Sequence, residues 1–136
     1  MKTAELVKEV MHRAGLNSRI QAENAIRATL ETISEHLTPE EAENFSAQLP
    51  PELASYMQQP FSGVAERFAL AEFFERVSQR EGIGLQAATF HARAVAAVVA
   101  EAITVGQVEH LRAQLPRDIA QLFNVQNAGE IPELKQ

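Results

Sequence analysis

The sequence predicts an all-α protein, built as two tandem, diverged four-helix units packed as one helical domain. Three observations support this prediction. Apolar residues recur at helical spacing along most of the chain, a segment near the N-terminus is repeated further on, and both copies carry helix caps at matched positions. The composition, with 46% hydrophobic and 22% charged residues, is that of a chain that can bury a core.

The repeat is clearest in two stretches of sequence. Residues 5–16, ELVKEVMHRAGL, match residues 72–83, EFFERVSQREGI, and after a one-residue deletion the match continues to the tetrapeptides AQLP at 47–50 and 113–116. Identical pairs along the match are Glu5 with Glu72, Val10 with Val77, Arg13 with Arg80, Gly15 with Gly82, Ala22 with Ala88, Arg27 with Arg93, Glu35 with Glu101, and Thr38 with Thr104.

This match divides the chain into four parts. Residues 1–57 form the first helical repeat, 58–63 the linker, 64–124 the second helical repeat and 125–136 a flexible C-terminal tail. The linker QQPFSG is rich in turn residues, and the tail contains Asn, Gly, Pro and charges. We expect Ala65 to Leu70 to add two turns to the first helix of the second repeat. The two repeats should share one core and be related by a rough twofold axis, because about 57 residues bury their apolar faces only marginally.

Each repeat begins with an amphipathic helix that ends at a glycine. Gly15 and Gly82 stand where a left-handed residue closes a helix, and Arg13 and Arg80 in the last turn face its negative end. The second helices, about 19–37 and 85–103, are rich in Ala, so we expect them near the centre of the fold.

The third and fourth helices are set by caps and prolines. Thr38 and Thr104 begin capping boxes, with Glu or Gln three residues later. The third helices end near the AQLP turns, because the residue before a proline avoids helical angles. Pro50 and Pro116 then start short fourth helices.

With these elements in place, the chain resembles a bacterial family named domain of unknown function 2267. The resemblance rests on Arg13-Ala14-Gly15-Leu16, on the Ala- and Arg-bearing helix around Ala25 to Arg27, and on the two AQLP turns. It extends to about Phe123. The second repeat departs from the pattern at Glu81 and Ile83. The resemblance implies the fold and no activity, cofactor or partner.

Charge and composition exclude several classes of function. The net charge is −6 and both repeats are acidic, which argues against nucleic-acid binding. No apolar run is long enough to span a membrane, and no apolar signal segment follows Met1, so we expect a cytoplasmic protein. Cys is absent, which excludes disulfides and thiolate chemistry.

No residue pattern predicts catalysis, a cofactor or a metal. The four histidines, His12, His36, His91 and His110, lack the helical spacing of a metal-binding pair, and we interpret them as surface or hydrogen-bonded side chains. Glu40, Glu41 and Glu43 form an acidic cluster in the first turns of a helix, where negative charge is favoured in any case.

Arg27 and Arg93 are the sharpest candidates, and we interpret them as structural residues. Arg27 has Glu23 and Glu31 one turn away, which predicts an ion-pair ladder at the surface. Arg93 has Thr89 and Ala97 instead, so we expect it to reach a carboxylate, or the carbonyls of an AQLP turn, on another helix. The candidate structural residues are therefore Arg27, Arg93, Thr38, Thr104, Pro50 and Pro116.

These observations favour a non-enzymatic helical protein–protein interaction module, which binds another protein or a second copy of itself. The alternative is a protein that binds a small apolar ligand between the repeats, near four phenylalanines: Phe68, Phe73, Phe74 and Phe90. An enzyme is the least supported of the three classes.

Overall fold

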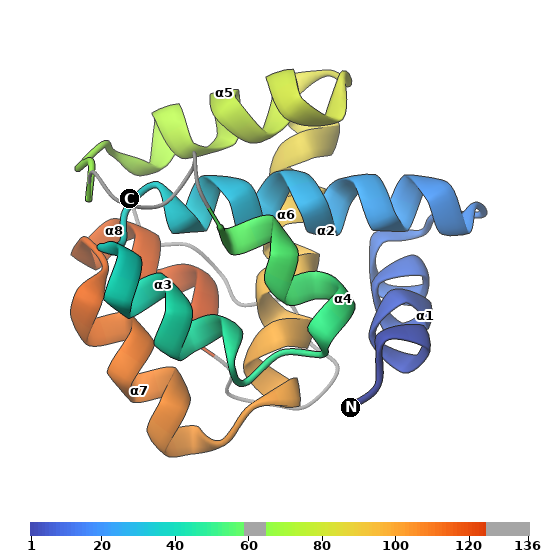
Figure 1. Cartoon of the computed structure of the whole chain (residues 1–136). Coiled ribbons are helices and arrows are strands. Elements are labelled where there is room, and N and C mark those ends of the chain that lie inside the picture. Colours follow the sequence, from blue (N-terminus) through green and yellow to red (C-terminus); the bar gives the residue numbers. More distant parts are fainter. Residues whose placement is uncertain (59–64, 125–136) are drawn as a thin grey trace.

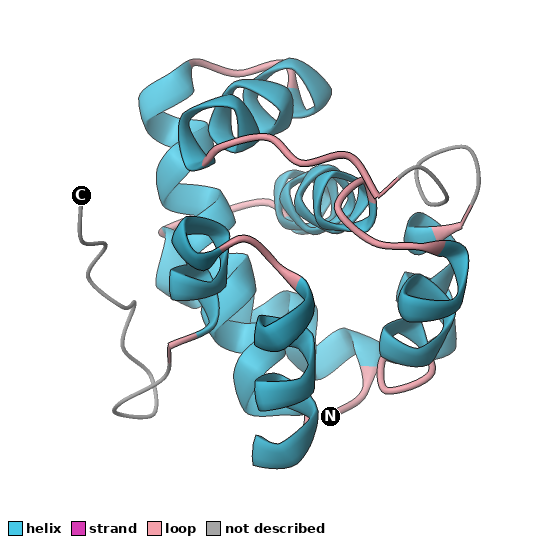
Figure 2. Ribbon diagram, turned by 90° about the vertical axis from the view of Figure 1, so that its left-hand side faces the viewer, coloured by secondary structure: helices cyan, strands magenta, loops and turns pink. Residues whose placement is uncertain are grey.

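The computed structural model describes residues 1–58 and 65–124, and all regular structure in them is helical (Figure 2). The first half, residues 1–58, contains α1 (Thr3–Ala14), α2 (Arg19–Ser34), α3 (Pro39–Ser46), α4 (Pro51–Ala54) and the 3₁₀ helix η1 (Ser55–Met57). The second half, residues 65–124, contains α5 (Leu70–Glu81), α6 (Leu85–Ala102), α7 (Val105–Gln114), α8 (Arg117–Ala120) and the 3₁₀ helix η2 (Gln121–Phe123). The all-α prediction is confirmed.

The order of elements is the same in both halves, and the helices of the two halves interleave. The first helix of each half contacts the second helix of the other half, so that α1 packs on α6 and α5 packs on α2 (Figure 1). The two long helices α2 and α6 also contact each other. Neither half therefore covers its own apolar faces alone.

The predicted helix ends are present. Gly15 has a φ of 67° and Gly82 a φ of 71°, the left-handed conformation that glycine adopts without strain. Thr38 and Glu41 form a full capping box at the start of α3. At α7 the Thr104 hydroxyl accepts from the Gln107 N–H, without the return bond among the described residues. Pro50 and Pro116 directly precede α4 and α8.

Two predicted helix boundaries are wrong. Residues 65–69 do not extend α5. Instead the Glu66 N–H donates to the Glu35 carbonyl, Phe68 is buried, and the Leu70 N–H donates to the Asp118 carboxylate at the start of the helix. The second helix ends at Ser34 rather than near residue 37, since tighter turn bonds lead from there to the Thr38 cap. The predicted tail, and the linker beyond Gln58, lie outside the described residues.

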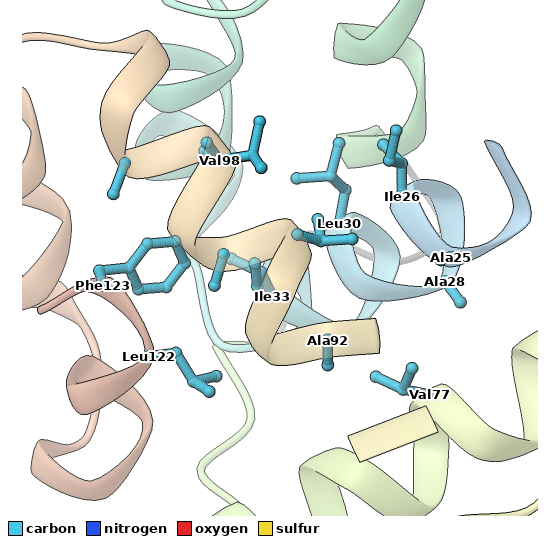
Figure 3. Packing of buried hydrophobic residues seen from close by; sticks show 14 of the residues in the cluster. Ala25, Ile26, Ala28, Leu30, Ile33, Val77, Ala92, Val98, Leu122 and Phe123 are labelled. Carbon is cyan, nitrogen blue, oxygen red and sulfur yellow. The ribbon is translucent and has the colours of Figure 1, made fainter. Parts of the chain in front are cut away.

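The core is one cluster of buried apolar side chains drawn from both halves. The helices α2 and α6 lie at its centre, as their alanine content predicted. Figure 3 shows Ile26, Leu30 and Ile33 of α2 packed near Val98 of α6, with Phe123 at one end. In α6 every residue from Ala94 to Ala100 is buried, and small side chains there allow neighbouring helices to approach closely.

Among the described residues, no single helix has both the length and the apolar composition to cross a membrane. Only α5 and α6 taken together, bent by 100° at their junction, have that length and composition.

Candidate functional site

A bidentate ion pair between the two halves joins Arg13 at the end of α1 to Glu101 near the end of α6. Two guanidinium nitrogens of Arg13 lie 2.6 and 2.7 Å from the two carboxylate oxygens of Glu101. The side chains are only 8% and 16% exposed. A bidentate pair of this kind is directional and is weakly screened by solvent.

A second pair crosses in the opposite sense. Arg80 at the end of α5 lies 2.6 Å from the Glu35 carboxylate and donates to the Thr32 hydroxyl at 2.7 Å. Arg76, one turn earlier on α5, is 3.1 Å from the other oxygen of Glu35. An arginine of each half is therefore held by a glutamate of the other half.

The sequence contained the signal for these crossed pairs, although its interpretation missed them. Arg13 matches Arg80 and Glu35 matches Glu101 in the repeat. Each arginine was expected to face the end of its own helix, and the two glutamates were given no role. Two opposite charges retained at the same two positions in both repeats are what a reciprocal ion pair requires.

Arg27 forms one of the two ion pairs that its neighbours in the helix predicted, and it also contacts another helix. Its guanidinium lies 3.1 Å from the Glu31 carboxylate, as the ladder interpretation predicted, and 3.1 Å from the backbone carbonyl of Arg80. It thus supplies a donor to a carbonyl at the end of α5. The other expected rung is absent, since Glu23 pairs with Arg19 at 2.7 Å.

The AQLP turn of the second half is met by a different arginine. Arg67 donates to the Gln114 carbonyl at 3.2 Å. Arg112 donates to the Ala120 carbonyl, which lies in the short helix after Pro116. Arg93 lies on α6 and is partly buried, and the expectation that it contacts another helix stays a prediction.

His36 is the most unusual polar side chain, and it contradicts its assignment as a surface or hydrogen-bonded residue. It is 0% exposed, and neither ring nitrogen has a hydrogen-bond partner within residues 1–58 and 65–124. Its ring lies 3.9 Å from that of Phe68, centroid to centroid, and Arg76 covers Phe68 at 3.7 Å. Burial lowers the pKa of His36 to about 4, and the positive charges of Arg67 and Arg76 act in the same direction.

A buried carboxylate–histidine pair closes the junction of α5 and α6. Glu81 is 3% exposed at its side chain, and one of its oxygens lies 2.8 Å from Nδ1 of His91. Burial raises the pKa of Glu81, while the hydrogen bond to His91 and the charge of Arg27 oppose that rise. The repeat places Ala14 and Ala25 at the matching positions of the first half. The second repeat therefore differs from the first at both positions of this pair. Glu81 stands in place of one alanine, and its partner His91 stands in place of another.

Within the part of the chain that the structure describes, the acidic cluster and two of the phenylalanines have structural roles. Within the described residues no three His, Asp or Glu side chains converge as a metal site would require. Glu41 of the acidic cluster caps its own helix. Phe73 contacts Phe74 edge to face at 5.9 Å between ring centroids, so these rings pack as core.

Comparison with known proteins decides the family. A family described as an uncharacterized conserved protein, DUF2267, matches residues 3–122, which include both crossed pairs. The chain belongs to the DUF2267 family. No curated protein matches it. The resemblance noted in the sequence is thereby confirmed.

Several large apolar side chains of this DUF2267 protein are exposed to solvent. Large apolar side chains are exposed at the starts of helices, including Ile20 on α2, Leu85 and Phe90 on α6, and Val105 on α7. Leu85 is 49% and Phe90 42% exposed, and Ala87 between them is also exposed. We call Leu85, Ala87 and Phe90, which lie in the first two turns of α6 and spread around the helix rather than along one face, the α6 apolar strip.

Proposed function

We propose that this protein is a non-enzymatic, cytoplasmic interaction module that associates with a second copy of itself through the α6 apolar strip. The observation that carries the proposal is the exposure of Leu85 and Phe90 within the first six residues of α6. Residues 94–100 of the same helix are all buried, so the large exposed apolar side chains of α6 lie near its start. Leu85 and Phe90 are the kind of side chain that protein interfaces bury.

Two copies of this acidic chain can meet at an uncharged stretch of α6. The whole chain carries a net charge of −6, so two copies repel each other over most of their surfaces. Residues 85–92, LQAATFHA, contain no Asp, Glu, Lys or Arg. A self-contact through this uncharged stretch brings apolar groups together without opposing like charges.

The small-ligand alternative has less support. Phe73 and Phe74 contact each other, Phe68 packs against His36, and Phe90 lies at the surface. Three of the four rings that were candidates for a ligand site therefore take part in packing within the protein.

Sedimentation velocity over the micromolar range tests the proposal. The wild-type chain should shift from monomer to dimer with rising concentration, and Leu85→Gln/Phe90→Gln should remain a monomer. Glutamine keeps a high helix propensity. Ile20→Gln is the matched control, because it removes an exposed apolar side chain from the start of another helix. A wild-type chain that stays monomeric, or a double variant that dimerises as well as the wild type, contradicts the proposal.

A further inference from the structure

The crossed ion pairs divide the interface between the halves in a specific way. Arg13 and Glu35 belong to the first half, yet each finds its partner in the second half, and the same holds in reverse for Arg80 and Glu101. The contacts α1 with α6 and α2 with α5 follow the same pattern. Each half thus presents one arginine and one glutamate that pair with the other half.

Separation of the halves would leave these charges poorly compensated. The Arg13 side chain is 8% exposed and the Glu101 side chain 16% exposed, so both are largely removed from water in the folded chain. Separation would break this pair and would also expose the apolar side chains of the core that both halves share, which is unfavourable in water. A half that lacks its partner therefore has a strong preference for any chain that offers the complementary half.

We infer that a second copy of this chain can supply that complementary half. Two chains would exchange halves, with the first half of each packed on the second half of the other. The contacts between halves that the structure describes are all retained in such an exchange, which makes exchange energetically cheap. In a single chain the tethered half is present at high effective concentration, so the closed monomer prevails until it is selectively weakened. This inference does not use the α6 apolar strip and stands apart from the proposed function.

Two charge-reversed chains test the exchange. Arg13→Glu places two glutamates together in the closed monomer, and Glu101→Arg places two arginines together. When the two variants exchange halves, the introduced glutamate of one chain meets the introduced arginine of the other, and the original Arg13 meets the original Glu101 in the second pairing. Both variants are prepared with Leu85→Gln/Phe90→Gln, so that association through the strip does not contribute.

The two variants are unfolded, mixed in equal amounts and refolded, and the product is measured by native mass spectrometry and thermal melting. The expected result is a species holding one chain of each variant, which melts roughly 5 °C above either variant alone. Each variant refolded by itself should give no such gain. A mixture of two monomers with unchanged melting temperatures overturns the inference.

The double variant Arg13→Glu/Glu101→Arg in one chain is the internal control. It should refold as a monomer more stable than either single variant, because the reversed pair forms within the chain. If it is no more stable than the single variants, the crossed pair does not join the halves, and the inference is overturned as well.

Discussion

Arg13 and Glu101 are 88 positions apart in the sequence, yet they form a two-pronged ion pair with N–O distances of 2.6 and 2.7 Å. The pair ties the end of the first helix to the end of α6. Its counterpart, Arg80 with Glu35, ties α5 to the segment that follows α2. Both ion pairs are directional, and both connect the first half of the chain to the second half.

The first prediction concerns the stability that Arg13 contributes. Arg13→Met keeps much of the side-chain stem but leaves the Glu101 carboxylate without its main partner, and we expect a loss of about 2 to 3 kcal/mol in unfolding free energy. Arg19→Met is the matched control, since Arg19 forms an exposed pair with Glu23 one turn away, and its loss should be at most about 0.5 kcal/mol. Urea denaturation followed by circular dichroism measures both. Equal losses would show that the pair of Arg13 and Glu101 contributes no more to the unfolding free energy than the exposed pair of Arg19 and Glu23.

The second prediction concerns pH and His36. The folded pKa of about 4 lies below the ordinary value of 6.5, so the unfolded chain takes up a proton first as the pH falls. The stability is therefore fully present above pH 6.5 and is lost as the pH falls from 6.5 towards 4. At pH 5 the loss from this one group is about 2 kcal/mol. Glu35 and Asp118 face His36 and moderate the shift, while Arg67 and Arg76 enlarge it.

Urea denaturation at pH 7 and pH 5 measures the effect. His36→Leu removes the titrating ring, so its stability should fall much less between the two pH values than that of the wild type. His12→Gln is the control, because His12 is exposed, and it should follow the wild type. If His36→Leu loses as much stability as the wild type, the buried ring is not the source of the acid sensitivity.

The third prediction concerns the buried pair of Glu81 and His91. Each single change to alanine leaves a partner without its hydrogen bond in a buried place, which should cost about 2 kcal/mol. The double change to alanine restores the residue types found at the matching positions of the first half. It should therefore cost less than the sum of the single changes by about 1 kcal/mol or more. Additive losses in thermal or urea unfolding would mean that the two side chains are not coupled.

The fourth prediction compares Arg27 and Arg93. Arg93→Met should cost about 1 to 3 kcal/mol, because it removes a partly buried cation and leaves its acceptors unpaired. Arg27→Met should cost less, since the Arg27 side chain is 34% exposed. Melting temperatures of the two variants decide the order. A larger loss at Arg27 would show that its bond to the Arg80 carbonyl matters more than its exposure suggests.

The sequence was informative where structure depends on local chemistry. Gly15 and Gly82 close their helices because a left-handed residue is needed there, and Thr38 caps α3 through bonds to its own next turn. The positions of α2 and α6 at the centre followed from their many small side chains. Contacts such as these depend on neighbours in the chain, so spacing and residue type suffice to predict them.

Long-range contacts were harder to predict. Arg13 offers no local sign that its partner is Glu101 rather than Glu9, to which it is also bonded. The predicted helix over residues 65–69 was wrong for a similar reason. Phe68 lies outside α5 and packs its ring against His36, a contact between residues far apart in the sequence. His36 itself is buried by that segment, a result that no pattern around residue 36 indicated.

The most direct test is a double-mutant cycle on the pair that joins the halves, with Arg13→Met, Glu101→Gln and the two changes combined, each measured by urea denaturation. We predict that the unfolding free energy of the double variant exceeds the value expected from adding the single losses by about 1.5 to 2 kcal/mol. That coupling would show that Arg13 and Glu101 hold the two halves together in solution. Strictly additive losses, with no coupling beyond experimental error, would contradict it.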